Sequence, residues 1–191
     1  MHSFDPFPVL ETPRLILREL VPADVDLIQR NASDPAVNKY LGRDLDTSFE
    51  TAQKRLQTVL DNTRDHTGIR WGIQRKEDMV TMGTVGFWKW NKPHYYAEIG
   101  YEIGSAYWNK GYMTEAIRAA LRFGFEQMEL HRAEANIDPD NIGSRRAAEK
   151  AGFRHEATLR ENWFYAGRFT DSVIYAVLKH EFEALERRGH G

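Results

Sequence analysis

The stretch Gly104-Ser-Ala-Tyr-Trp-Asn-Lys-Gly-Tyr-Met-Thr-Glu-Ala116 decides the fold, because the end of a predicted strand runs directly into the start of a helix. The first backbone N–H groups of a helix have no partner within it and lie at the positive end of its dipole, so they favour an anion. Gly111 lets the backbone approach a ligand closely, and Lys110 adds positive charge. The stretch therefore predicts a diphosphate-binding turn.

The sequence before this turn predicts a pair of helices and several strands. One helix should run from Pro22 to about Ala32, and a second from the capping-box pattern Thr47-Ser-Phe-Glu50 to about Arg64. Strands rich in β-branched and aromatic residues are expected over 13–20, 69–75, 80–90 and 95–103. The last three follow one another across short polar turns, which indicates an antiparallel meander.

After Gly111 the spacing of apolar residues changes from the alternation of strands to the period of a helix. Apolar residues recur at helical spacing and predict a long amphipathic helix to about Glu129. A short strand is expected over 132–137, followed by a helix that Asp140 or Asn141 caps and that ends near Lys150. Two more strands are expected over 154–163 and 168–178, with a charged tail from Glu181 that is either a solvated helix or disordered.

Composition excludes several classes of function. The chain has 191 residues, which suits a single domain, and a net charge of −2, which gives no general attraction to nucleic acid or anionic membranes. It has no cysteine, so thiolate chemistry and Cys-ligated zinc are excluded, and its 7 histidines show no pair at metal-ligand spacing. No leader or membrane span is evident, so we expect a cytoplasmic protein without a metal.

The order of these elements and four short phrases resemble the GNAT superfamily of N-acetyltransferases, within it the RimJ/RimL-like ribosomal-protein N-terminal acetyltransferase branch. The phrases are Leu10-Glu-Thr-Pro-Arg-Leu-Ile-Leu-Arg18, Ala97-Glu-Ile-Gly-Tyr101, Trp108-Asn-Lys-Gly-Tyr-Met-Thr-Glu-Ala116, and Asp138-Pro-Asp-Asn-Ile-Gly-Ser-Arg-Arg146 with Glu149-Lys-Ala-Gly-Phe153. The match covers about residues 10–180 of one domain spanning 1–191, with 181–191 as a charged tail. It implies an α/β (α+β) fold: a mixed, mostly antiparallel twisted sheet of about six to seven strands flanked by about four helices.

The resemblance implies that acetyl-CoA binds at the strand-to-helix turn and at the start of the following helix. The residues it assigns to the cosubstrate are Ile103, Trp108, Asn109, Lys110, Gly111, Tyr112, Met113, Thr114, Asn141 and Ser144. Trp108 and Met113 depart from the residue types usual in the family's loop, Gln or Arg at the first position and Gly or Ala at the last. Binding through backbone amides does not depend on those side chains.

Two glutamates on the strand over 95–103 are candidates for the general base. Side chains alternate along a strand, so Glu98 and Glu102 share a face. At ~3.3 Å per residue they lie about 13 Å apart, too far to share a proton, so one base is the better interpretation. Glu98 is preferred because Ala97-Glu98-Ile99 resembles the stretch that carries the catalytic glutamate in histone-acetylating relatives. The alternative is that both are solvated or paired strand residues.

The resemblance also bears on the leaving group. Many relatives protonate the leaving thiolate with a tyrosine, and that position is Ala148 here; the RimL-like branch uses the serine of its Asn-x-x-Ser, which would be Ser144. Asn141 would orient the cosubstrate, although it and Ser144 could equally be helix-capping residues. The glutamate proposed as base in that branch falls on Trp163, with Glu161 two residues earlier, which is a second departure.

Together these points predict an N-acetyltransferase that moves the acetyl group of acetyl-CoA to a primary amine by direct attack, with both substrates bound. The acceptor expected from the resemblance is a protein N-terminal α-amine of the ribosomal-protein type. A small amine, namely a polyamine, an amino acid or an aminoglycoside, is the alternative within the same chemistry. A module that binds acetyl-CoA without turnover is the alternative from another class. The protein is expected to be a monomer or a homodimer.

Overall fold

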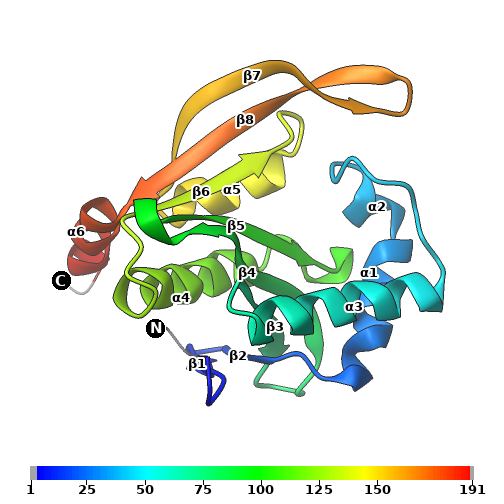
Figure 1. Cartoon of the computed structure of the whole chain (residues 1–191), viewed down its shortest axis with the longest axis horizontal. Helices are drawn as coiled ribbons and strands as arrows, with labels where there is room; N and C mark the ends of the chain where they lie inside the picture. The colour runs from blue at the N-terminus through cyan, green and yellow to red at the C-terminus, as the bar shows by residue number, and fades with distance from the viewer. Residues whose placement is uncertain (1–3, 190–191) are drawn as a thin grey trace.

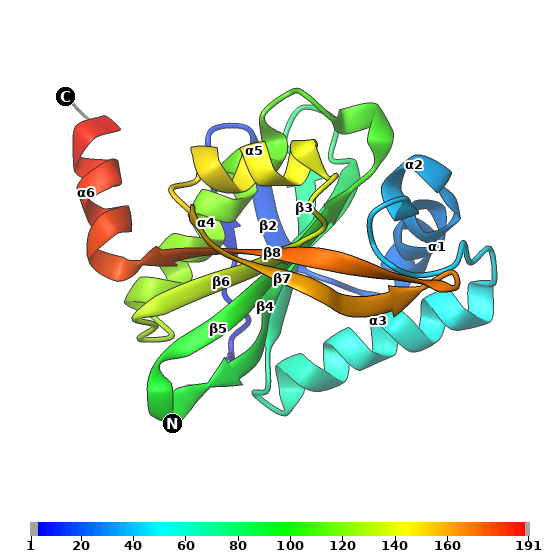
Figure 2. The same cartoon turned by 90° about the horizontal axis from the view of Figure 1, so that it is seen from above.

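The computed structural model describes residues 4–189, which form one sheet with helices on both faces (Figures 1 and 2). Its eight strands are β1 (Leu10–Glu11), β2 (Leu15–Glu19), β3 (Ile69–Arg75), β4 (Thr81–Asn91), β5 (Tyr96–Ile103), β6 (Arg132–Ile137), β7 (Arg154–Tyr165) and β8 (Arg168–Leu178). Their order is β1-β2-β3-β4-β5-β6-β8-β7. Every neighbouring pair is antiparallel except β5 and β6, which are parallel.

Six α-helices lie within residues 4–189: α1 (Val25–Ser33), α2 (Pro35–Asn38), α3 (Phe49–Arg64), α4 (Tyr112–Glu126), α5 (Ile142–Lys150) and α6 (Lys179–Gly189). Short 3-10 turns, η1 (Pro22–Asp24), η2 (Lys92–His94) and η3 (Ser105–Tyr107), join some of them to the strands. Helices α4 and α5 cover one face of the sheet, whereas α1 and α3 cover the other (Figure 2).

The mixed, mostly antiparallel sheet predicted from the sequence is confirmed, and three elements were either missed or left open. Strand β1 and helix α2 are too short to show a period; the third, α6, was left open between a solvated helix and disorder, and the tail from Glu181 forms that helix. That helix packs on the protein through Phe182, which is buried against Phe125. The predicted capping box is shifted by one residue, because Ser48, not Thr47, caps α3. Residues 1–3 and 190–191, including His2 and His190, lie outside the described residues.

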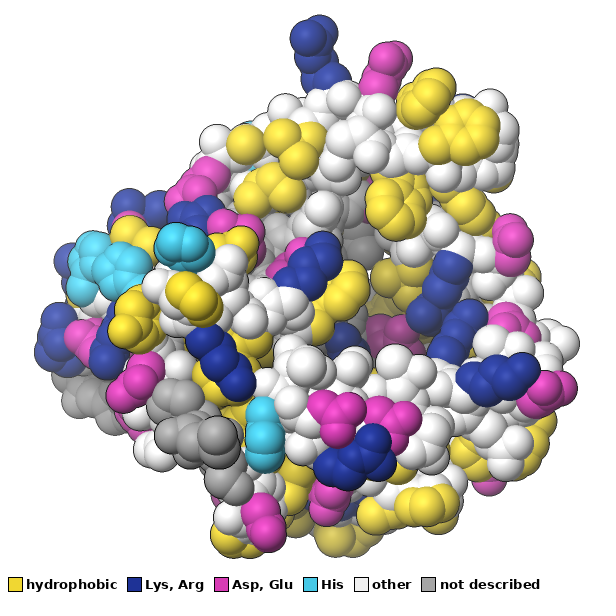
Figure 3. All heavy atoms as spheres, in the orientation of Figure 1, with side chains coloured by type: hydrophobic (Ala, Val, Ile, Leu, Met, Phe, Trp, Pro, Cys, Tyr) yellow, Lys and Arg dark blue, Asp and Glu magenta, His cyan; other side chains and the backbone are white. Residues whose placement is uncertain are grey.

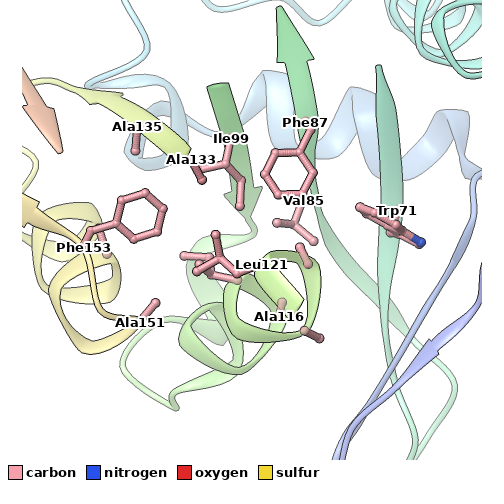
Figure 4. Close-up of a cluster of buried hydrophobic side chains, with 14 of the residues drawn as sticks. Trp71, Val85, Phe87, Ile99, Ala116, Leu121, Ala133, Ala135, Ala151 and Phe153 are labelled. Atoms are coloured by element: carbon pink, nitrogen blue, oxygen red, sulfur yellow. The ribbon is translucent and has the colours of Figure 1, made fainter. Parts of the chain in front are cut away.

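Helix α4 fills the centre of the main hydrophobic core (Figure 4). Its apolar stripe follows from the helical spacing in the sequence, and Ile117 and Leu121 are fully buried. Leu121 lies between the sheet residues Val85 and Ile99 and the end of α5 at Ala151 (Figure 4). The start of α4 is thereby fixed against the edge of the sheet where β5 ends.

A buried ion pair ties the opposite helical layer to the sheet. Asp24, with a side chain 8% exposed, accepts hydrogen bonds from Arg18 at 2.8 and 2.9 Å and from the Val21 N–H at 2.8 Å. Burial alone would raise the pKa of Asp24, but the hydrogen bonds from Arg18 and Val21 outweigh it and lower the pKa below its usual value. The carboxylate is therefore stabilised in the folded state.

Replacing Asp24 by asparagine is expected to lower the free energy of unfolding by about 1–3 kcal/mol at pH 7. A depressed carboxyl pKa contributes stability above the unfolded-state pKa of ~3.9 and loses it as the pH falls toward the folded-state pKa. The difference between Asp24→Asn and the wild type should therefore shrink below about pH 4. Urea unfolding at pH 7 and pH 3 measures it, and an equal difference at both pH values would contradict this account.

The β7–β8 hairpin extends from the sheet across to the loop between α2 and α3 (Figure 1). Near its tip the Tyr165 hydroxyl donates to Asp44 at 3.0 Å, and the Trp163 indole lies directly on Gly42. Gly42 has a φ of +57°, and a side chain there would collide with the indole. The hairpin and this loop together close one end of the face that α1 and α3 cover.

Within the described residues no helix is long and apolar enough to span a membrane. Residues 4–189 also contain no cluster of three or more His, Asp or Glu side chains that could hold a metal ion.

Candidate active site

The parallel strands β5 and β6 separate within the sheet. Their ladder joins Tyr96–Glu98 to Arg132–Glu134 and stops there, while β6 goes on to pair with β8 through Ile137. The remaining residues of β5, 99–103, have no ladder partner on the β6 side within the described residues. Unpaired backbone groups along a strand can bind an extended, amide-containing ligand as an added strand would.

The start of α4 lies just beyond the end of β5. Gly111 occupies the N-cap position with a φ of +79°, and no side chain of the described residues caps the helix. Asn109 also has a positive φ, +60°. The side chains of Tyr112 and Met113 pack against the core, so they do not cover the backbone amides at the start of the helix. The departure at Met113 therefore does not narrow the turn.

Two residues predicted to bind the cosubstrate take part in the turn itself. The Trp108 indole N–H donates to the Ile103 carbonyl at 2.9 Å and so closes the connection between β5 and α4. The Lys110 ammonium donates to the Ala106 carbonyl at 3.0 Å, so in this structure it turns back onto η3.

Arg14 supplies a cation beside Gly111 that the sequence analysis did not assign. Its guanidinium donates to the Lys110 carbonyl at 2.9 Å, lies over the Tyr112 ring and pairs with Glu115 at 2.6 Å. Burial alone would raise the pKa of Glu115, but hydrogen bonds from Thr12 and Arg14 lower it. A surface pocket of about 520 Å³ lies beside Gly111 and includes Thr114, Glu115 and Arg118 in its lining.

Ser144 faces β5 across the separation of the strands. Its N–H donates to the side chain of Asn141 at 3.0 Å, so Asn141 caps α5 as expected for an N-cap. The Ser144 and Tyr101 hydroxyls lie 2.9 Å apart, and the Tyr101 hydroxyl lies 3.3 Å from the Ser144 carbonyl. Burial raises the pKa of Tyr101 to about 12, so its phenol stays protonated at neutral pH.

The two glutamates of β5 lie on the opposite face of the sheet from Tyr101, as alternation requires. Glu98 is the last β5 residue in the parallel ladder, so it marks the point where β5 and β6 separate. Its carboxylate accepts from the Lys89 ammonium at 2.8 Å, and the Lys89 side chain is 60% exposed. Exposed pairs of this kind contribute little to stability, so Lys89 can leave Glu98 at small cost.

Glu102 is held differently. Arg43, from the loop after α2, donates to its carboxylate at 3.0 Å, and both side chains are partly buried. The structure therefore distinguishes the two candidates for the base by their partners: Glu98 pairs with an exposed lysine, whereas Glu102 pairs with a partly buried arginine from another element. Figure 3 shows a hollow on this face, below the β7–β8 hairpin, with both basic and acidic side chains around it.

A family model described as an acetyltransferase (GNAT) domain matches residues 14–154 of this sheet-and-helix arrangement. The chain belongs to the GNAT family of acetyltransferases. It is thus an acetyl-CoA-dependent N-acyltransferase, as the sequence resemblance implied.

Relatives of this GNAT acetyltransferase support the assignment along nearly the whole chain. It is 36% identical to the uncharacterized N-acetyltransferase YoaA of Bacillus subtilis, over 91% of this chain and 98% of that protein. It is 26% identical to the [ribosomal protein uS5]-alanine N-acetyltransferase of Escherichia coli, over 65% of each chain. A spermidine N-acetyltransferase from Vibrio cholerae, solved with CoA and spermine, shares the fold with a TM-score of 0.79 at 22% identity, over 90% of this chain and 99% of that one.

Sequence reasoning placed the GNAT turn and helix starts but missed the groups that act through tertiary contacts. Arg14 and Tyr101 were named only as parts of two motif phrases in the sequence, and neither spacing nor composition shows that they reach Gly111 and Ser144. Trp163, at the position where the RimL-like branch carries its glutamate, packs on Gly42 with an exposed indole, and Glu161 lies on the same exposed strand.

Proposed function

We propose that this acetyltransferase moves the acetyl group of acetyl-CoA to a protein N-terminal α-amine, with both substrates bound together. The observation that carries the proposal is the separation of β5 from β6 directly beside the uncapped start of α4. An extended pantetheine arm fits unpaired strand backbone, and a diphosphate fits free helix amides. The relative named as a [ribosomal protein uS5]-alanine N-acetyltransferase supports the choice of a protein acceptor.

In this proposal, residues on one face of the sheet deprotonate the acceptor amine, and residues on the other face assist the leaving thiolate. Glu98 takes a proton from the ammonium of the acceptor, directly or through water. The resulting free amine attacks the carbonyl carbon of the thioester and forms the C–N bond, and the C–S bond breaks with CoA leaving as a thiolate. An α-amine with a pKa of ~8 releases its proton more easily than a lysine near 10.4, which suits a carboxylate base. Ser144 and Asn141 lie on the other side of the gap, where Ser144 can hydrogen-bond the leaving thiolate.

The experiment that tests this function is acetyl-CoA-dependent release of free thiol, with Ala-, Ser- and Met-starting peptides tested beside spermidine and an aminoglycoside. The protein contributes no thiol of its own, because the chain has no cysteine. Turnover with the peptides alone is expected. Turnover with the small amines alone would support the proposed mechanism but contradict the proposed acceptor. No turnover with any peptide or small amine would contradict the proposed function for all the acceptors tested.

Replacing Gly111 by alanine is expected to weaken acetyl-CoA binding by roughly tenfold, the factor that corresponds to 1.4 kcal/mol. The added Cβ would lie 3.3 Å from an Arg14 nitrogen, at the surface the cosubstrate must approach, in a backbone conformation that disfavours side chains. Calorimetric titration measures the affinity. Gly167→Ala is the matched control, since Gly167 has the same φ of +79° with nothing within 4 Å. Equal affinity losses in both variants would reject a direct role for Gly111.

Replacing Tyr101 by phenylalanine is expected to lower kcat roughly 2- to 12-fold, the effect of one ordinary hydrogen bond, with little change in KM for acetyl-CoA. While Tyr101 donates to the Ser144 oxygen, the Ser144 hydrogen is free to point toward the gap between the strands. Tyr175→Phe is a suitable control because that hydroxyl bonds Glu149 and Arg145 instead. Unchanged kcat in Tyr101→Phe would show that the contact is purely structural.

A further inference from the structure

The guanidinium of Arg70 lies on the same face of the sheet as Glu98 and Glu102. Arg70 is on β3 opposite Gly86 of β4, and Gly86 is in turn opposite Gly100 of β5. Because the two glycines have no side chains, the arginine reaches across both strands. One of its nitrogens lies 2.9 Å from the place where a Cβ on Gly100 would stand.

Arg70 is a half-buried cation with few hydrogen-bond partners and no ion-pair partner among the described residues. Among residues 4–189 its guanidinium donates one hydrogen bond, to the Thr84 hydroxyl at 2.9 Å, and no carboxylate of these residues lies within ion-pair distance. Burial lowers the pKa of Arg70 below its usual value. The negative charge of Glu102 raises the pKa, and the positive charge of Arg43 lowers it further. A guanidinium carries five donors, so most of its hydrogen-bonding capacity remains for a ligand.

The charges around Arg70 do not balance. Arg43 is already paired with Glu102 at 3.0 Å, so two guanidinium groups share one carboxylate. Glu98, two residues from Gly100, is paired with Lys89 in this structure. Immediately around Arg70 and Arg43, positive charge therefore exceeds negative charge by one, which attracts an anion to this part of the face.

We infer that Arg70, assisted by Arg43, binds a side-chain carboxylate of the acceptor, so that the acetylated amine belongs to a molecule that also carries an acidic side chain. This inference rests on the proposed function, in which Glu98 receives the amine. Glu98 and Gly100 are two residues apart on β5, about 6.6 Å along the strand, so amine and carboxylate are separated by several bonds. A peptide with an acidic first residue and a free acidic amino acid share this chemistry. A polyamine does not.

Matched acceptors that differ only in the carboxylate test the inference. Thiol release is measured with peptides that begin Asp-Ala or Asn-Ala, with free glutamate and glutamine, and with spermidine. The wild type is expected to favour the acidic member of a pair by at least roughly tenfold in kcat/KM, the effect of a charge-assisted hydrogen bond. Preference within the peptides or within the free amino acids identifies which of the two sources the protein uses.

Arg70→Gln is expected to abolish the preference while turnover of the neutral peptide changes little. Arg75→Gln, on the same strand but paired with Asp78, is the control and should keep the preference. If Arg70→Gln does not fold, as judged by its circular dichroism, Arg43→Gln in the loop after α2 replaces it and should weaken the same preference. Equal use of acidic and neutral acceptors by the wild type, or a preference for spermidine, would overturn the inference and leave the proposed chemistry intact.

Absence of turnover with every acceptor would count against the proposed function, and binding then decides the inference separately. The acidic and neutral peptides are titrated calorimetrically into the CoA-loaded protein. Tighter binding of the acidic peptide by the wild type, lost in Arg70→Gln, supports the carboxylate site. Equal binding of both peptides overturns it.

Discussion

Glu98→Gln is expected to lower kcat about 100- to 10,000-fold, the usual contribution of a general base, while the affinity for acetyl-CoA stays unchanged. Glutamine keeps the size and the hydrogen-bonding reach of the side chain but cannot take a proton from the ammonium. Steady-state thiol release gives kcat, and calorimetric titration of CoA gives the affinity. The loss should be smaller at high pH, where more of the acceptor amine is already unprotonated.

Glu102→Gln is the control for this variant, since it sits on the same strand face but is held by Arg43. It is expected to retain most of kcat. If Glu102→Gln loses the activity and Glu98→Gln keeps it, the base is Glu102. If neither loses it, the amine enters the site already deprotonated and the proposed role of Glu98 is wrong.

Leu121→Ala is expected to lower the free energy of unfolding by about 2–5 kcal/mol. Leu121 is fully buried on α4 beneath the sheet, so its removal leaves a cavity that the surrounding core cannot fill (Figure 4). Urea unfolding followed by circular dichroism measures the loss.

Leu159→Ala makes the same chemical change at a position that is 42% exposed on β7. It should alter the free energy of unfolding by less than about 0.5 kcal/mol, the usual range for surface positions. A comparable loss in both variants would mean that the core around α4 is not the main source of stability.

The helices and strands that could be predicted from the sequence are those with a sustained period. The strand over 69–75, the strand over 132–137 and the helix that ends at Lys150 were predicted with their observed bounds. Helix α4 ends at Glu126, three residues before the expected Glu129, because a helical period alone does not mark the last turn. Helix α6 was ambiguous because a single buried residue, Phe182, anchors an otherwise charged segment.

In the candidate site, too, some features could be predicted from the sequence and others could not. The turn at Gly111 and the cap at Asn141 depend on backbone conformation, which short sequence motifs report well. The contacts of Tyr101 with Ser144 and of Arg43 with Glu102 join residues 43 and 59 positions apart. Such contacts depend on how strands and loops are packed, and one sequence contains no local signal for them. The carboxylate site at Arg70 could not be inferred for that reason.

The β7–β8 hairpin, which contacts the loop between α2 and α3, affects the order in which the parts of the site form during synthesis. The Tyr165–Asp44 contact joins residues 121 positions apart, so a nascent chain has made both early helices, the meander and the turn at Gly111 well before it reaches Trp163. Chains are made from the N-terminus, and folding follows that direction. A polypeptide that ends before the hairpin would therefore carry the proposed diphosphate-binding turn and both glutamates but lack the hairpin beside the proposed acceptor site, so the hairpin is the last part of that site that the growing protein gains.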